Sequence, residues 1–215
     1  KYSDLQVIKV IGIPTATTNA ASAKVDGVEL AAVLRPVSGL RLDGSFTYLD
    51  SRFSNFFSTN PLYPTGPANP GYAIWLAANP NAKTPIFGGV GGAEQDLTGY
   101  RLPGAPKYSL TGGIQYDLET GNGGKMTARV DAAYSSRIHY SEFNDVNLSQ
   151  KAVTKINAFL RYESNSFWSL SVWGKNLTNE YVKSNELVTI ALWGYPRYGS
   201  IEPPRTYGVT LGAKF

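Results

Sequence analysis

The only histidine of the chain, His139, lies close in sequence to three serines, Ser135, Ser136 and Ser141. A histidine beside a serine hydroxyl can act as a general base and activate that oxygen for attack on an ester. The sequence around these serines has no recognisable nucleophile motif and no evident acid to orient the imidazole. A polar histidine on the wet face of a strand explains His139 better, so we expect no catalytic residue and no enzyme.

Seven aromatic residues stand in two predicted loops, the first of which is rich in Gly, Pro and Asn. Aromatic rings on an exposed loop can stack on a flat or cyclic ligand. Packing within the loops is the simpler explanation for each ring alone. As a group they are the candidate ligand-binding residues: Tyr63, Tyr72, Trp75, Phe87, Trp193, Tyr195 and Tyr198.

Five charged residues alternate with apolar residues in the second half of the chain and therefore share polar faces: Asp117, Arg129, Asp131, Lys155 and Arg161. Charges held against a neighbouring surface need partners whatever the function of the protein. We expect each of them to pair with another charge or to be hydrated. As a group they are candidates for contact with a segment that fills the interior of a barrel.

The composition limits the kind of protein to which these residues belong. Charged residues make up 17% of the 215 residues, below the roughly 25% usual in soluble domains, and aromatic residues reach 13%. The absence of cysteine excludes disulfides and thiolate metal sites, and we expect no metal and no cofactor. The net charge of +4 is dispersed, without the basic cluster of a nucleic-acid surface. No stretch approaches the ~18 apolar residues of a transmembrane helix.

A strict two-residue alternation of apolar and polar residues dominates the second half of the chain and predicts β-strands with two unlike faces. Near the end, for example, Tyr207, Val209 and Leu211 share one face. Around Gly27 the alternation loses phase, which predicts a bulge. The pattern as a whole predicts eight strands, near residues 2–10, 22–35, 39–54, 105–119, 125–140, 151–163, 167–185 and 204–215.

The predicted connections are alternately short and long. Tight turns are expected at 36–39, 120–124 and 163–166, whereas the longest connection includes residues 57–103. Outer-membrane barrels have short periplasmic turns and long extracellular loops, so residues 57–103 are expected to be extracellular. In this orientation the apolar face carries one aromatic belt at each end, as expected at two membrane interfaces. The belts are Tyr48, Tyr108, Tyr134 and Tyr207 at the loop end, and Tyr116, Tyr162, Trp168 and Phe215 at the turn end.

A soluble β-sandwich or lipocalin-like barrel is the main structural alternative, because its strands alternate as well. In such a protein the apolar face points inward and forms a dry core. The two hypotheses differ in where Leu110, Val130, Leu160 and Leu211 lie. We expect an antiparallel transmembrane barrel, in which these four side chains face lipid and the polar face lines the interior.

Two stretches near the end of the chain resemble the C-terminus of TonB-dependent outer-membrane receptors. The first is Lys-Asn-Leu-Thr-Asn at 175–179, followed by Tyr181, which in that family lies on the penultimate strand. The second runs from Pro204 to Phe215 and resembles the family's last strand. Three earlier segments are also similar to strands of the family, so that the resemblance covers nearly the whole chain except 57–103: Tyr2–Val7, Ala21–Arg35 and Pro36–Phe56.

By this resemblance, residues 1–215 would be the C-terminal segment of a 22-stranded barrel in the bacterial outer membrane and would supply its last eight strands. An N-terminal plug and the TonB-binding box, which this segment lacks, would lie upstream. The implied function is TonB-coupled uptake of a scarce large solute such as a ferric siderophore, cobalamin, haem or an oligosaccharide. Implied partners are membrane lipid, the plug and remaining strands, TonB through the missing N-terminal part, and the barrel-assembly machinery, for which Phe215 resembles the C-terminal signal.

A complete eight-stranded barrel, acting as a structural anchor or an adhesin, is the alternative function. Eight strands can close on themselves with side chains filling the interior. Pairing of residues 1–10 with 205–215 would indicate that small barrel. Edges that stay apart would indicate an arc of a larger wall, since open strand edges are not tolerated in lipid.

Overall fold

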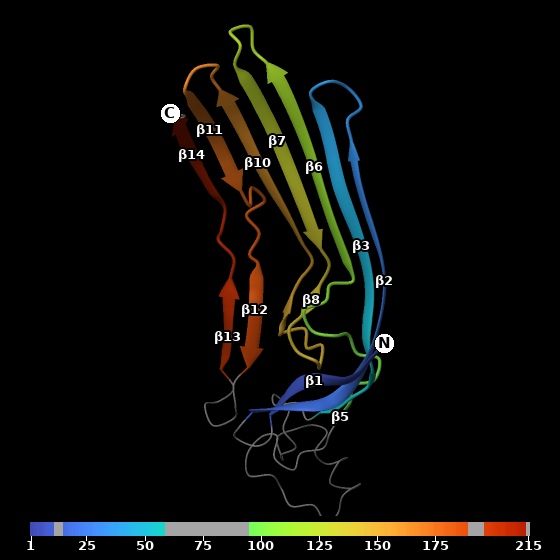
Figure 1. The fold of residues 1–215 in the computed structure, drawn as a ribbon. Coiled ribbons are helices and arrows are strands. Elements are labelled where there is room, and N and C mark those ends of the chain that lie inside the picture. Colours follow the sequence, from blue (N-terminus) through green and yellow to red (C-terminus); the bar gives the residue numbers. More distant parts are fainter. Residues whose placement is uncertain (11–14, 59–94, 189–195, 214–215) are drawn as a thin grey trace, which may run out of the picture.

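The computed structural model describes residues 1–10, 15–58, 95–188 and 196–213. Eight strands form one antiparallel sheet in the order β1-β2-β3-β6-β7-β10-β11-β14 (Figure 1). Among the described residues there is no helix long and apolar enough to cross a membrane. The strands of the sheet are β1 (Tyr2–Val10), β2 (Thr15–Leu34), β3 (Leu40–Asn55), β6 (Tyr108–Glu119), β7 (Lys125–Ser135), β10 (Val153–Glu163), β11 (Trp168–Lys175) and β14 (Thr206–Ala213).

Three two-stranded sheets lie beyond one end of the large sheet, opposite the tight turns, as the lower half of Figure 1 shows. We call this the loop end and the other the turn end. The sequence analysis did not predict these small sheets as separate elements. They pair β4 (Phe57–Ser58) with β5 (Gln95–Asp96), β8 (Ile138–His139) with β9 (Ser149–Gln150), and β12 (Lys183–Val188) with β13 (Arg197–Ile201).

All eight predicted strands are present, but the strand predicted at 22–35 begins earlier, at Thr15, and two others stop well before their predicted ends. The strand predicted at 125–140 stops at Ser135, and the one predicted at 167–185 stops at Lys175. Beyond Lys175 the backbone turns, because Asn176 (φ 50°) and Asn179 (φ 56°) adopt left-handed conformations that interrupt a strand. The side-chain amide of Asn176 fixes this turn, because its Oδ1 accepts from Glu180 N and its Nδ2 donates to Glu180 O, both at 2.9 Å.

The bulge predicted at Gly27 is wrong. Gly27 pairs regularly with Leu49, and the register shift between β2 and β3 lies instead between Ser22 and Ala23. A Cβ atom at Gly27 would lie 2.7 Å from the carbonyl oxygen of Tyr48. Glycine therefore allows a close approach of two regularly paired backbones, and its missing side chain is what disturbed the alternation.

The apolar face of the large sheet is bare. Leu110 is 42% exposed, Val130 and Leu160 are each 48% exposed, and Leu211 is 78% exposed. These four residues are thus not gathered into a dry core, which contradicts the soluble alternative. The strand register aligns apolar residues across four strands in rows such as Leu42–Ile114–Val130–Ala158.

Both aromatic belts are recognisable on this face. At the loop end, Tyr48 pairs with Tyr108 across β3 and β6, and their ring centroids are 5.5 Å apart. At the turn end the rings of Tyr162 and Trp168 are 5.3 Å apart. Phe215, predicted for the turn-end belt, lies outside the described residues.

Among the described residues, the buried apolar cluster lies at the loop end. Ala21, Phe53, Phe56 and Leu97 are at most 3% exposed, and the rings of Phe53 and Phe56 lie 4.7 Å apart. The amide of Leu97 donates to the carbonyl of Phe56 at 2.8 Å. We call these four residues the loop-end core; they join the two described ends of the long connection.

The eight strands do not close into a barrel. β1 and β14 lie at opposite edges of the sheet, and within the described ranges neither strand pairs with the other. The pairing of residues 1–10 with 205–215 that a self-contained eight-stranded barrel requires is therefore not observed, and the sheet is an arc of a larger wall.

Candidate functional site

Arg129 is the centre of an ion-pair network on the polar face of the sheet. From β7 its guanidinium donates to both carboxylate oxygens of Asp43 on β3, at 2.8 and 2.9 Å. It also donates to Asp131 through Nε at 2.9 Å. The side chains of Arg129 and Asp43 are only 17% and 22% exposed. Two-pronged pairing of this kind fixes the orientation of the guanidinium.

The Arg129–Asp43 pair depends on a glycine. Gly113 stands between the two strands, paired with Asp43 on one side and with Asp131 on the other. A Cβ atom there would lie 2.3 Å from Nη2 of Arg129 and 2.8 Å from Oδ2 of Asp43. The alternation of the sequence predicted Arg129 and Asp131 but not Asp43 and Gly113, because only the register between β3, β6 and β7 brings these residues together.

Asp117 lies nearer the turn end on the same polar face and is also satisfied by neighbours. It accepts from the Thr127 hydroxyl at 2.7 Å and from the Gln115 amide at 3.2 Å. The Lys125 ammonium lies 3.4 Å from Oδ2, the oxygen that also accepts from Gln115. Asp117 is therefore held on the wall by three partners from β6 and β7.

The remaining two predicted charges, Lys155 and Arg161, are paired too. Nζ of Lys155 lies 2.6 Å from Oε2 of Glu202, and Nη2 of Arg161 lies 2.8 Å from Oε1 of Glu163. All five predicted polar-face charges thus have partners, four of them on strands of the large sheet and one, Lys155, at Glu202 between β13 and β14. The structure does not bring them together into one cluster, since they are distributed over several ion pairs along β6, β7 and β10.

An aromatic surface that the sequence analysis missed lies on the polar face of β10 and β11, where Phe159 pairs with Trp173. The Trp173 indole donates to Thr210 at 3.1 Å, and the Lys175 ammonium lies 5.6 Å from the indole ring. Gly208 leaves room for the ring, because a Cβ there would lie 2.5 Å from it. One signal in the sequence could have revealed this surface. Phe159 and Trp173 are aromatic residues at positions where the alternation otherwise places polar residues.

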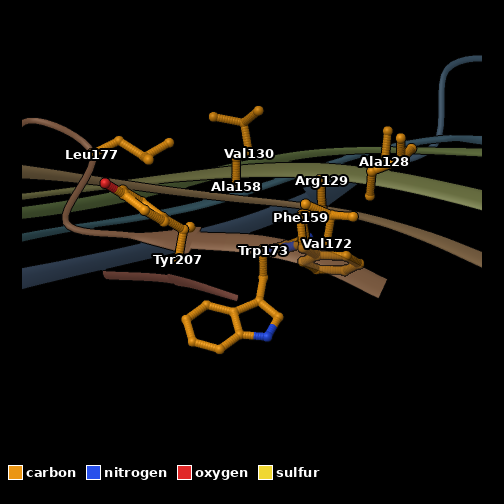
Figure 2. Close-up of a pocket in the computed structure, with 11 residues that line it drawn as sticks. Ala128, Arg129, Val130, Ala158, Phe159, Val172, Trp173, Leu177 and Tyr207 are labelled. Carbon is orange, nitrogen blue, oxygen red and sulfur yellow. The ribbon is translucent and has the colours of Figure 1, made fainter. Parts of the chain in front are cut away.

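On the other face of the same strands lies a shallow apolar groove of about 490 Å³. Its floor is made of small residues such as Ala158 and Gly174, and Leu177 and Tyr207 stand beside them. Figure 2 shows Trp173 pointing away from the side on which Val130 and Leu177 lie. One face of the β10–β11 pair is therefore an apolar groove, and the other carries the aromatic pair with its hydrogen bond and a neighbouring ammonium group.

Tyr198 is the described member of the predicted group of ligand-binding aromatic residues. Tyr63, Tyr72, Trp75, Phe87, Trp193 and Tyr195 lie outside the described residues, as does Phe215. Tyr198 is described: it lies on β13, opposite Leu187 of β12, and is 56% exposed. The ring of Tyr198 is thus exposed at the loop end, where a ligand could reach it.

His139 lies on β8 at the loop end, without a hydrogen bond to a nearby serine. The Ser136 hydroxyl accepts from Tyr108 N, and the Ser135 hydroxyl donates to Ser136 O. In the described part of the chain, Nδ1 of His139 and the hydroxyl of Ser141 are buried without a partner. Burial is the main cause that lowers the pKa of His139. The arrangement does not form a serine–histidine pair.

A sheet with a bare apolar face, aromatic belts at both ends and paired charges on the other face is the wall of a transmembrane β-barrel. A family model described as TonB dependent receptor-like, beta-barrel matches residues 1–177, and the chain belongs to this family. Its place is the bacterial outer membrane. The family is one of receptors rather than enzymes. Comparison with curated proteins found no match.

Solved structures share this fold. The siderophore receptor PiuA from Acinetobacter baumannii gives a TM-score of 0.61 at 19% identity, over 96% of this chain and 24% of that chain. The ferric yersiniabactin uptake receptor FyuA from Yersinia pestis gives 0.66 at 18% identity, over 93% and 25%. BauA, the ferric preacinetobactin receptor from Acinetobacter baumannii, gives 0.58 at 16% identity, over 96% and 25%. The chain spans about a quarter of each of these proteins.

Proposed function

We propose that this chain is part of an outer-membrane receptor for the TonB-coupled uptake of a ferric siderophore. The observation that carries the proposal is the bare apolar face on one side of the sheet and a polar face with ion-paired charges on the other, because such a wall is stable only between lipid and a wet interior. The solved structures of similar fold bear the names of siderophore receptors. Cobalamin, haem and oligosaccharides are the competing solutes.

In this proposal the polar face meets the plug of the same protein. Charges that are already paired in the wall can exchange hydrogen bonds with a plug without being left bare when it moves. Asp131, whose side chain is 38% exposed, is a suitable contact because Arg129 keeps it paired. TonB acts through the part of the protein upstream of this chain, and Phe215 serves the assembly machinery.

Ligand capture is assigned to the aromatic loop residues, of which Tyr198 is the described member. Its exposed ring can stack on a catecholate or another planar iron-binding group. Tyr198→Ala in the complete receptor should raise the Kd for the ligand while leaving barrel assembly unchanged. Tyr181→Ala, which removes another exposed tyrosine (66% exposed) outside β12 and β13, is the matched control.

The function is tested in the source bacterium by deleting the gene and measuring uptake of iron-labelled siderophores under iron limitation. We expect uptake of one siderophore to be lost in the deletion strain and restored by the intact gene. The same uptake should be lost when TonB is absent, since the transport is active. Undiminished siderophore uptake, together with loss of cobalamin, haem or oligosaccharide uptake, would refute the siderophore and identify the competing solute.

A further inference from the structure

A group of cations stands just beyond the loop-end tyrosine belt, on the same face of the wall. Tyr48, Asp50 and Arg52 alternate along β3 and therefore point to the same side. The backbones of Arg52 and Arg101 pair in an isolated antiparallel β-bridge, and Lys107 immediately precedes Tyr108. We call Arg52, Arg101 and Lys107 the basic patch.

The basic patch has more cations than carboxylates. Arg52 and Arg101 share the single carboxylate of Asp50, at 2.9 and 3.2 Å from the same oxygen. Lys107 has no carboxylate within ion-pair distance among the described residues, and its ammonium lies 5.9 and 5.2 Å from the rings of Tyr48 and Tyr108. Three cations against one carboxylate leave an excess of positive charge.

The charges on the neighbouring strand β2 do not cancel this excess. On β2 the residue paired with Arg52 is Lys24, whose ammonium is 2.8 Å from Asp26. Both side chains of that pair are more than 60% exposed, and together they are neutral. The carboxylate of Asp26 on β2 is therefore already paired with its own lysine.

A hollow of about 380 Å³ lies at the basic patch, lined by Arg52 and Arg101 with Tyr100, Phe143 and Asn144. Hydrogen bonds hold its shape: Asn144 accepts from Arg101 N at 2.8 Å and donates to Arg101 O at 2.9 Å. Arg52 donates to Gly99 O at 2.9 Å. The site is thus a shallow depression lined by two guanidinium groups and two aromatic rings.

The patch lies at the outer edge of the headgroup layer of a membrane. Arg52 is four residues beyond Tyr48, which at ~3.3 Å per residue and a strand tilt of ~40° is roughly 10 Å of height. Tyrosine belts lie at the headgroup level, and the headgroup regions add roughly 5–8 Å on each side of the hydrocarbon. The face that carries Tyr48 looks toward lipid, and the long side chain of Arg52 can reach back from this height into the headgroup layer.

We propose that the basic patch binds a phosphate-bearing headgroup of an anionic lipid in the outer leaflet. The guanidinium groups of Arg52 and Arg101 would hold the phosphate by charge-assisted hydrogen bonds. Lys107 would add a point charge at the tyrosine belt, and Tyr100 and Phe143 would contact the less polar part of the headgroup. This role is independent of which solute the receptor transports.

The test uses the complete receptor in detergent and measures its affinity for lipid A with both phosphates by native mass spectrometry. We expect Arg52→Gln/Lys107→Gln to lower the affinity roughly tenfold or more, since each cation at an anionic membrane surface contributes roughly a fivefold factor. Arg35→Gln/Arg41→Gln removes the same charge at the turn end and should leave the affinity unchanged. Lys107→Gln alone, which breaks no ion pair in the described structure, should lower it roughly fivefold.

Three results would overturn the proposal. The first is equal lipid A binding by the parent and the Arg52→Gln/Lys107→Gln variant. The second is equal binding of lipid A after removal of its phosphates. The third is displacement of lipid A by an equimolar amount of inorganic phosphate, because the ligand would then be a soluble anion rather than a lipid.

Discussion

The middle of the wall and its loop end differ in where their apolar side chains lie. In the middle, along β6, β7 and β10, the apolar side chains point outward and remain exposed, as Ile114 does at 58%. At the loop end Phe56 and Leu97 are fully buried against the chain's own residues. The first region needs lipid to cover its apolar surface, whereas the second carries a small core like that of a soluble protein.

This difference shows where sequence changes will act. A polar residue is harmful on the outer face of the middle wall but harmless on its inner face. At the loop end the loss of apolar volume is harmful, because no lipid can fill the cavity. The same substitution therefore has a different cost in the two regions.

The largest effect is expected from Phe56→Ala. Emptying a buried phenylalanine site costs about 3–5 kcal/mol, and here it should open the loop-end core while leaving β6 and β7 intact. Hydrogen exchange in the complete receptor should show faster exchange at Leu97 and Gly99. The neighbouring Phe57, which is 45% exposed, provides the control Phe57→Ala with little change. Equal exchange in the two variants would show that the core is not cooperative.

A slightly smaller effect is expected from Val130→Lys in the middle wall. A lysine on the lipid face near the midplane costs about 2–4 kcal/mol. The free energy of unfolding, measured by denaturant titration in lipid vesicles, should fall by that amount. Ser109→Lys on the polar face of β6 is the control and should change stability little. A similar loss in both variants would mean that the two faces are not distinguished by the membrane.

Replacing Gly113 tests the polar face of the middle wall. A valine there would overlap the Arg129–Asp43 pair, and overpacking of this kind costs about 1–3 kcal/mol. Arg129→Ala should recover part of the loss by removing the overlapping side chain. The measurement is a double-mutant cycle on the free energy of unfolding. Simple additivity of the two substitutions would contradict the close contact.

The smallest effect is expected from pH at the loop end. Burial, the largest cause, together with the charges of Arg137 and Arg101, lowers the pKa of His139 below its ordinary value. The unfolded chain, with a histidine pKa near ~6.5, therefore takes up the proton first as the pH falls. Stability of β8 and β9 should be full above about pH 6.5 and decrease below it.

This pH dependence is measured by hydrogen exchange at β8 and β9, with rates corrected for intrinsic exchange at each pH. His139→Gln should remove the difference between pH 7 and pH 5.5, because glutamine does not titrate. A pH dependence that persists in His139→Gln would assign it to another group.

Alternation predicted the eight strands well because each strand separates two unlike environments. It gave the wrong ends for two strands because a strand's end depends on local turns, such as the one that Asn176 fixes with its side chain. The polar-face charges were found, but their partners were not. Asp43 is 86 residues from Arg129 in sequence, and only the register of three strands brings them together.

The space above Gly113 has an evolutionary consequence. Positions 113 and 129 compete for one small volume, so neither can be exchanged freely while the other stays as it is. In a lineage that acquires a side chain at 113, we expect position 129 to have become short beforehand, and Asp43 to have lost its charge with it. The substitution history of this wall should therefore be ordered, with the glycine the last of the three to change.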